Sequence, residues 1–124
     1  MILGDLYSIK DLKEEENNTI SANIDINDRH IIFKGHFPNR PVMPGVCLTN
    51  MITDVISAYV KEAQFLQSAD FIKFINLVIP SETYSVKVLV KLLSGNDSLA
   101  AEASIVSGNT TFLKLKGNFA RKAV

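Results

Sequence analysis

The chain has 124 residues, 47% of them hydrophobic, and its 13 basic side chains balance 13 acidic ones. This length fits one domain, residues 1–124, and this hydrophobic content excludes an intrinsically disordered chain. A formal net charge of zero excludes a general nucleic-acid binder, which needs an excess of Lys and Arg.

Cysteine and histidine are scarce, with Cys47 alone of the first kind and His30 and His36 of the second. One cysteine excludes an internal disulfide and a multi-cysteine zinc site, so we expect neither a metal ion nor a cofactor. The first residues lack the basic start of a signal peptide, and no run approaches the roughly 18 apolar residues of a membrane span. We therefore expect a cytoplasmic protein that does not enter a membrane.

Charge is distributed unevenly along the chain. Residues 1–28 carry seven acidic residues and two lysines, whereas residues 108–124 carry four basic residues and no acidic one. Such runs are typical of solvated strand faces. The alternative is that the basic end forms an edge that binds an acidic partner.

The first part of the chain predicts a β-hairpin. Apolar and polar residues alternate from Ile20 to Ile26, with one apolar face, as in a half-buried strand. Residues 3–12 form a weaker strand candidate. The polar residues from Glu14 to Asn18 separate the two segments and are typical of a turn.

The segment from Gly35 to Gly45 predicts a stiff loop, because it contains three of the four prolines of the chain. The apolar residues that follow have the spacing of a helix, which we place at residues 45–64; they are Leu48, Met51, Ile52, Val55, Ile56, Tyr59 and Val60. Pro44 suits the start of this helix, and its broad apolar stripe predicts that it is mostly buried.

The remaining chain predicts four strands, at residues 71–79, 86–92, 99–105 and 111–119. The first is apolar enough to be a central strand and ends at Pro80, and turn signals at residues 95–97 and at Gly108 separate the others. Two strands, one helix and four strands define an α+β fold, in which one helix covers an antiparallel sheet. Because the sheet edges then need cover, a dimer that joins two sheets is a natural solution.

The run from Gly35 to Val46, GHFPNRPVMPGV, resembles the signature of the FabA/FabZ-type β-hydroxyacyl-[acyl-carrier-protein] dehydratases. The later run from Phe74 to Glu82, FINLVIPSE, also looks like a strand of that family, with Pro-Ser-Glu in place of its Pro-Gly-Asp turn. The resemblance covers most of the chain and implies the hotdog fold, an antiparallel sheet wrapped around one long central helix. It also implies a homodimer, or a higher oligomer of dimers, in which each site is shared between subunits.

The resemblance implies a reaction that removes water from a (3R)-3-hydroxyacyl thioester to give a trans-2-enoyl thioester. His36 matches the catalytic histidine of the family, and an imidazole suits a general base near neutral pH. Gly45 matches the glycine whose backbone N–H polarises the thioester oxygen at the helix N-terminus, in the manner of an oxyanion hole. The structural alternative for Gly45 is a glycine that merely permits the turn.

The sequence departs from the family at Asn50, where the family has Glu or Asp. Asparagine makes hydrogen bonds but cannot donate a proton as an acid. Three interpretations stay open: His36 carries the proton while Asn50 or a water molecule orients the hydroxyl, Asp54 supplies the carboxyl group, or the chain binds acyl groups without the reaction. Asp54 lies one helical turn after Asn50, at a position where the family often has glutamine, and its structural alternative is a helix-surface acid.

Further substrate contacts are expected from the loop, the helix start and the helix itself: Phe37, Arg40, Met43, Pro44, Val46 and Asp54. Phe37 and Met43 line the site or pack the loop, and Arg40 meets a phosphopantetheine phosphate or is solvated. We interpret His30 as a surface or loop-packing residue, and Cys47 as a small buried residue.

The sequence therefore predicts a homodimeric hydro-lyase, a (3R)-3-hydroxyacyl-ACP dehydratase of fatty-acid or related polyene or polyketide synthesis, with acyl carrier protein (ACP) as its partner. One alternative is a hotdog acyl thioesterase, in which Asp54 would have to serve. The other is a non-catalytic acyl-ACP binding subunit, partnered with an active homologue. The missing carboxylate favours this binding subunit, whereas the complete loop around His36 speaks against it.

Overall fold

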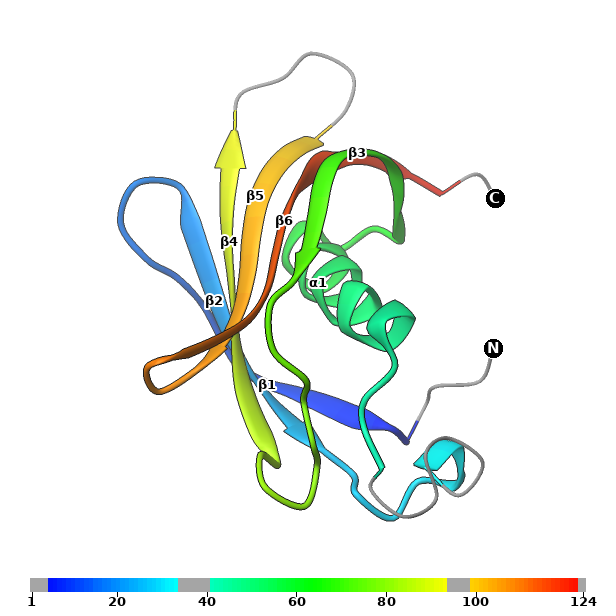
Figure 1. The fold of residues 1–124 in the computed structure, drawn as a ribbon. Coiled ribbons are helices and arrows are strands. Elements are labelled where there is room, and N and C mark those ends of the chain that lie inside the picture. Colours follow the sequence, from blue (N-terminus) through cyan, green and yellow to red (C-terminus); the bar gives the residue numbers. More distant parts are fainter. Residues whose placement is uncertain (1–4, 34–40, 94–98, 123–124) are drawn as a thin grey trace.

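The computed structural model describes residues 5–33, 41–93 and 99–122 and shows a curved sheet around one helix (Figure 1). The strands are β1 (Tyr7–Glu14), β2 (Thr19–Ile26), β3 (Gln64–Phe74), β4 (Ser85–Leu93), β5 (Leu99–Ser107) and β6 (Thr110–Arg121). The helix α1 spans Gly45–Val60, and a short 3-10 helix, η1, spans Ile31–Phe33. The expected α+β class is confirmed.

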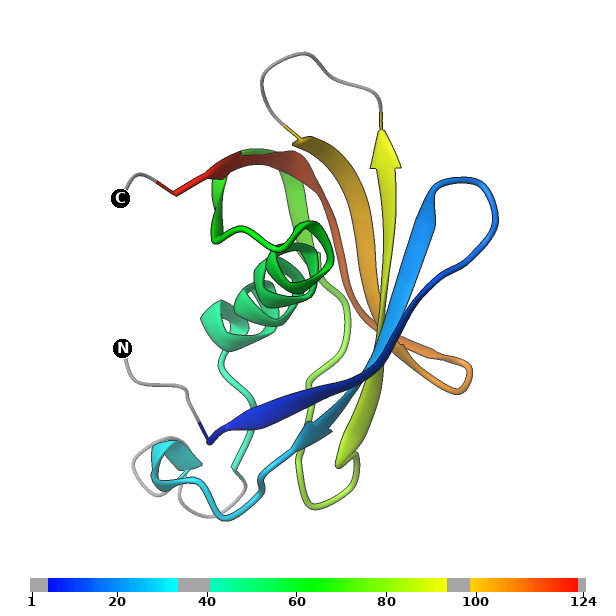
Figure 2. The same ribbon diagram turned by 180° about the vertical axis from the view of Figure 1, so that it is seen from behind.

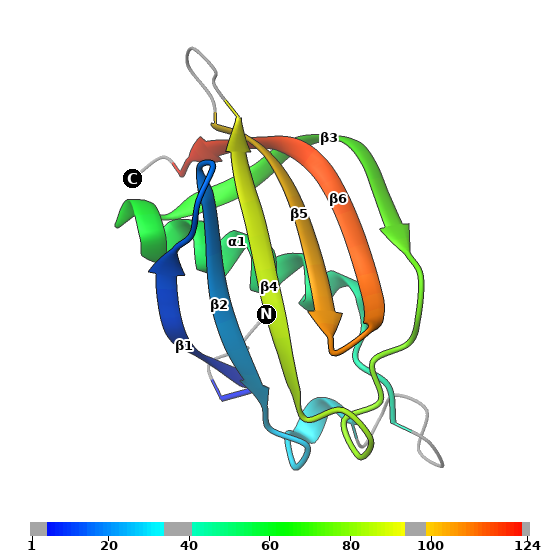
Figure 3. The same cartoon turned by 90° about the vertical axis from the view of Figure 1, so that its left-hand side faces the viewer.

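The six strands form one sheet in the order β1-β2-β4-β5-β6-β3, and every neighbouring pair is antiparallel. Figure 3 shows this order from the outer side of the sheet, with α1 behind it. The views from the two opposite sides show that the sheet curves around α1, which lies on its concave face (Figures 1 and 2). β1 and β3 are therefore the two edge strands.

The core fills the space between α1 and the concave face of the sheet. Every second residue of β4 is buried, namely Val86, Val88 and Val90, and β2 contributes its alternating isoleucines in the same way. The helix contributes one continuous stripe, made of Cys47, Leu48, Met51, Ile52, Val55 and Ile56. The opposite side of α1 is thus left outside the core, and it carries the polar residues considered below.

Both expected hairpins are present, with shifted ends. β1 begins at Tyr7 and ends at Glu14, later at both ends than expected, and pairs with β2. Asn17 and Asn18 have φ of 58° in the turn between them, a conformation that asparagine tolerates well. Gly108, with φ of 57°, forms the turn between β5 and β6.

The expectation of a central strand at residues 71–79 is wrong. β3 begins seven residues earlier, ends at Phe74 and lies at an edge of the sheet. The first half of β3 has little alternation of apolar and polar residues and forms a strand because it pairs with β6. The pairing has bulges on either side of Ser68 and Ala69. In the apolar run that follows, Ile75 and Leu77 are exposed while Val78 is buried. The apolar character of this run predicts a buried strand, but only part of the run is buried.

The expected end of the helix is also wrong, because α1 ends at Val60 and not at residue 64. Lys61 adopts a left-handed conformation with φ of 61°, and its N–H donates to the carbonyl oxygen of Ser57. The hydroxyl oxygen of Ser57 accepts from the backbone N–H of Gln64 at 3.0 Å, where β3 begins. This tight connection returns the chain directly into the sheet.

Candidate functional site

The N-terminus of α1 is formed by Pro44 and Gly45. Pro44 is extended, with φ of −61° and ψ of 143°, and its carbonyl oxygen accepts from the N–H groups of Cys47 and Leu48. Among the described residues, the N–H groups of Gly45 and Val46 donate to no protein acceptor. Because the first N–H groups of a helix carry its partial positive charge, this terminus can bind an oxygen that develops negative charge.

The ring of Phe74 lies against Gly45, and no local pattern in the sequence predicts this contact. A Cβ atom at Gly45 would lie 2.9 Å from Cε1 of Phe74, so the glycine allows a close approach. Phe74 ends β3 and is 58% exposed. The sequence predicts Phe74 inside a central strand, whereas in the structure β3 is an edge strand whose last residue, Phe74, lies at the helix N-terminus.

Asn50 and Asp54 lie on the side of α1 that faces away from the core. Asn50 is half-buried and Asp54 is exposed, whereas Met51 and Val55 beside them are fully buried. The side chain of Asn50 makes no hydrogen bond to any described residue. Asn50 and Asp54 thus lie outside the core on the same helix that begins at Gly45, and the Asn50 side chain is available for an external ligand.

Asp54 is held by Tyr7, a residue that sequence reasoning missed. The Tyr7 hydroxyl donates to Oδ2 of Asp54 at 2.5 Å, and this bond joins β1 to α1. Burial, followed by the hydrogen bond to Asp54, raises the pKa of Tyr7 far above its ordinary value. A parallel bond of 2.6 Å runs from the Tyr59 hydroxyl to Glu14 Oε1, and it raises the pKa of Tyr59.

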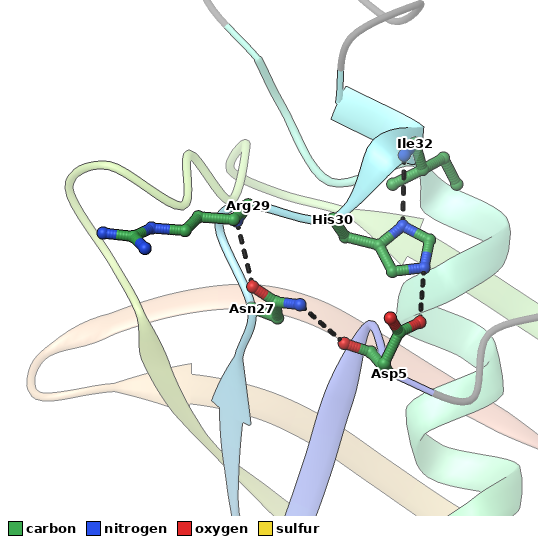
Figure 4. Close-up of polar contacts among 5 residues, drawn as sticks. All are labelled: Asp5, Asn27, Arg29, His30 and Ile32. Carbon is green, nitrogen blue, oxygen red and sulfur yellow. Dashed lines mark hydrogen bonds and ion pairs between the residues drawn. The ribbon is translucent and has the colours of Figure 1, made fainter.

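His30 lies just before the motif loop and is only 8% exposed, so it packs within the fold (Figure 4). Its Nδ1 accepts from the N–H of Ile32 at 3.1 Å, and its Nε2 lies 3.0 Å from Oδ1 of Asp5. The loop-packing interpretation of His30 is confirmed. Cys47 is fully buried, as expected, and burial raises the pKa of its thiol.

Three of the expected site residues, His36, Phe37 and Arg40, lie outside the described residues. Met43 is buried in the core, and its N–H donates to the carbonyl oxygen of Val78 at 2.8 Å. Of the two interpretations of Met43, packing of the loop agrees with this position. Val46 is 55% exposed on the first turn of α1 and is open to a ligand.

The basic residues of the C-terminal segment do not join this site. Lys114 and Lys116 lie on the outer face of the sheet, and the cross-strand neighbour of Lys116 on β5 is Glu102. They border an open groove of about 480 Å³ that also includes Lys91. This arrangement agrees with solvated strand faces, and binding of an acidic partner there stays a prediction.

The described residues contain no group of three or more His, Cys, Asp or Glu side chains placed to hold a metal ion. In the same part of the chain, no helix has the length and apolar character needed to cross a membrane.

Comparisons with known proteins identify the relatives of this chain. Residues 12–109 match the family model described as ApeI dehydratase. The 3-hydroxyacyl-[acyl-carrier-protein] dehydratase FabZ of Geotalea uraniireducens is 32% identical over 111 residues, which cover 82% of this chain and 75% of the relative. The enzyme of the same name from Levilactobacillus brevis is 30% identical over 105 residues, covering 78% of this chain and 70% of the relative.

Solved structures agree on the fold. The ApeI:P dehydratase heterocomplex of Xenorhabdus doucetiae includes a chain with a TM-score of 0.71 and 15% identity, over 92% of this chain and 97% of that one. The E. coli PaaI protein matches with a TM-score of 0.64 and 10% identity, over 91% of this chain and 79% of that one. These likenesses, together with the sheet curved around α1, define a hotdog-fold protein. The family match then specifies it further: the chain belongs to the ApeI-like dehydratase family.

Proposed function

We propose that this chain is a (3R)-3-hydroxyacyl-ACP dehydratase. His36 takes the proton from the carbon next to the thioester carbonyl, and the electron pair of that C–H bond forms the new double bond. The hydroxyl group leaves from the neighbouring carbon and receives the proton from His36, so that water departs. The N–H of Gly45 stabilises the charge that develops on the thioester oxygen.

The observation that carries this proposal is the arrangement of α1. Its N-terminal N–H groups at Gly45 and Val46 have no protein acceptor among the described residues, and Asn50 follows on the side of the helix that the core leaves open. The helix N-terminus thus offers donors for a thioester oxygen, and the Asn50 amide, five residues further along α1, offers a donor and an acceptor for a hydroxyl group. These two sets of groups support the proposed roles of Gly45 and Asn50 in stabilising the oxyanion and in orienting the leaving hydroxyl.

Asn50 acts in this proposal as a hydrogen-bonding guide for the leaving hydroxyl. Asp54 is a weaker candidate for the acid, because one of its carboxylate oxygens already accepts the Tyr7 hydroxyl at 2.5 Å. A carboxylate that accepts such a bond is fixed in orientation by β1. The same contact argues against the thioesterase alternative, which needs a carboxylate free to reach the thioester.

The non-catalytic alternative is favoured by one feature, the absence of a carboxyl group at position 50. An acyl-binding subunit needs the helix N-terminus and an apolar surface, but it does not need a proton carrier. The presence of His36 within the run from Gly35 to Val46 favours the enzyme over this alternative.

A second subunit is proposed at β3, which pairs with β6 on one side only. This edge carries exposed apolar side chains, namely Phe65, Phe71 and Phe74, and the following segment adds Ile75 and Leu77. An edge strand has backbone N–H and C=O groups without a neighbouring strand, and exposed apolar side chains beside them favour pairing with another chain. We propose a second copy as the partner. Because the ApeI:P structure is a heterocomplex, a different chain is the alternative to test.

The purified protein with a 3-hydroxyacyl-ACP substrate tests the proposed activity directly. Formation of the enoyl thioester, followed by its absorbance and by mass spectrometry of the carrier, is the expected result. Release of free acid would identify the thioesterase. Retention of acyl-ACP without either product would identify the binding subunit, and adding candidate homologous subunits would then test whether activity needs a heterocomplex.

A further inference from the structure

A polar cluster fixes the chain just before the motif loop (Figure 4). We call it the His30 cluster, and it consists of Asp5, Asn27, Arg29, His30 and Ile32. The Asn27 amide donates to the carbonyl oxygen of Asp5 at 2.9 Å, and its Oδ1 accepts from the N–H of Arg29 at 3.0 Å. The cluster thereby ties the segment before β1 to the turn that follows β2.

His30 is the member of this cluster whose ring is buried, and its contacts define its tautomer. Because Nδ1 accepts the N–H of Ile32, it carries no proton of its own. A neutral imidazole has one N–H, which must then lie on Nε2, 3.0 Å from a carboxylate oxygen of Asp5. The ring thus connects an acceptor on one side to a backbone donor on the other.

The bond to Ile32 lies where the chain enters the motif loop. Ile32 is in η1, and Phe33, which ends η1, is buried in the core at 4% exposure. The N–H of Phe33 also donates to the carbonyl oxygen of His30 at 3.1 Å. On the far side of residues 34–40, the chain is fixed again where Met43 donates to Val78. Both ends of the seven-residue stretch that contains His36 are therefore anchored.

We propose that His30 is a positioning residue, which uses its unprotonated Nδ1 to fix the entry of the loop that carries His36. This inference rests on the proposed function for its effect on turnover, because only there does His36 need a defined position. Asp5 contacts the ring at Nε2, and the N–H of Ile32 donates to Nδ1, so the position of the ring restrains the backbone at Ile32.

Two substitutions at the same position separate the two nitrogens. His30→Asn keeps an acceptor near the place of Nδ1, whereas His30→Gln keeps a donor near the place of Nε2 and loses that acceptor. We expect kcat of His30→Asn to stay within about threefold of the parent, and kcat of His30→Gln to fall about tenfold with KM nearly unchanged. Equal kcat values in the two variants would overturn the proposal.

Nuclear magnetic resonance gives a readout that does not depend on turnover. The chain has only two histidines, so ring nitrogens labelled with ¹⁵N give two sets of signals, which the His30 variants assign. In the unmodified protein at neutral pH, we expect the Nε2–H tautomer for His30. A ring protonated on Nδ1 instead would overturn the inference, whether or not the protein is active.

The same spectra distinguish failure of this inference from failure of the proposed function. If the parent protein dehydrates nothing, the proposed function is wrong, but the positioning role still predicts that the ring signals of His36 move in His30→Gln and stay in place in His30→Asn. Unmoved His36 signals in both variants would overturn the positioning role. Thermal melting of each variant shows that the comparison is made on folded protein.

Discussion

The Tyr7 hydroxyl lies 2.5 Å from Oδ2 of Asp54, although the two residues are 47 positions apart in the chain. This bond connects an edge strand to the open side of α1. Together with the Tyr59–Glu14 bond, it fastens β1 to the helix at two points. Because the Tyr7 hydroxyl occupies one oxygen of Asp54, the contact favours the proposed role of Asn50 over that of Asp54.

The order of effects at Asn50 and Asp54 tests the assignment of roles. If Asn50 guides the leaving hydroxyl, Asn50→Ala lowers kcat by about two- to tenfold, as expected for one lost hydrogen bond. Asp54→Asn then has the smaller effect, because Asn keeps an acceptor for Tyr7. Steady-state kinetics on a 3-hydroxyacyl substrate measures both, and the reverse order would assign the acid role to Asp54.

Restoring a carboxyl group at position 50 provides a complementary test. Asn50→Glu adds an acid without a large change in volume, so we expect faster dehydration of simple 3-hydroxyacyl substrates. A rate below that of the parent would mean that this site has adapted to the amide. Asn50→Gln, which lengthens the side chain without adding an acid, is the matched control.

Removal of the proposed base should have the largest effect on turnover. His36→Ala is expected to lower the dehydration rate by about 10²–10⁴-fold, which is typical for the loss of a general base. Its melting temperature should stay close to that of the parent. Unchanged turnover in folded His36→Ala would remove His36 from the mechanism.

The raised pKa of Tyr7 makes stability depend on pH in the alkaline range. Above about pH 10 the unfolded chain loses the Tyr7 proton while the folded chain keeps it, so the free energy of unfolding falls as pH rises. Below that pH this contribution is constant. Urea unfolding from about pH 9 to about pH 11.5 should show a shallower decline of the free energy of unfolding in Tyr7→Phe. Tyr59→Phe, at the second tyrosine–carboxylate bond, is the comparison. Identical declines in Tyr7→Phe and the parent would contradict this account.

A methyl group at Gly45 tests the helix N-terminus. Gly45→Ala displaces the exposed ring of Phe74, which is free to swing outward, so we expect less than about 1 kcal/mol of lost stability. The activation free energy of turnover should rise by more than this loss of stability, because the methyl group lies beside the proposed oxyanion position. Phe74→Ala removes the steric conflict, and if it restores the activity of Gly45→Ala, the ring and not the N–H was responsible.

The β3 edge predicts a dimer of about twice 13.7 kDa in sedimentation equilibrium. Phe71→Lys places a charge on this edge and should shift the equilibrium toward monomer. Tyr84→Lys makes a similar change at a residue that is 70% exposed and outside β3, and it should leave the dimer intact. A purely monomeric parent at micromolar concentration would contradict a site shared between two copies.

Local chemistry in the sequence is sufficient for several elements. The alternation from Ile20 to Ile26 predicts β2, Pro44 predicts the start of α1, and Gly108 predicts the last hairpin, because each depends on residues close together in the chain. The motif from Gly35 to Val46 indicates FabZ-like dehydratases, which the comparisons find among the relatives, and the family model that matches is that of ApeI dehydratase. These signals require no knowledge of distant contacts.

Pairings between distant segments required the tertiary structure. β3 is a strand because β6 lies beside it, and its edge position leaves Phe74 at the N-terminus of α1, which no periodicity in residues 64–79 predicts. Likewise, Tyr7 meets Asp54 only because the curved sheet brings β1 to the helix. Hydrogen bonds and ring contacts act over a few ångströms, so they depend on which segments the fold brings together and not on the local residue pattern.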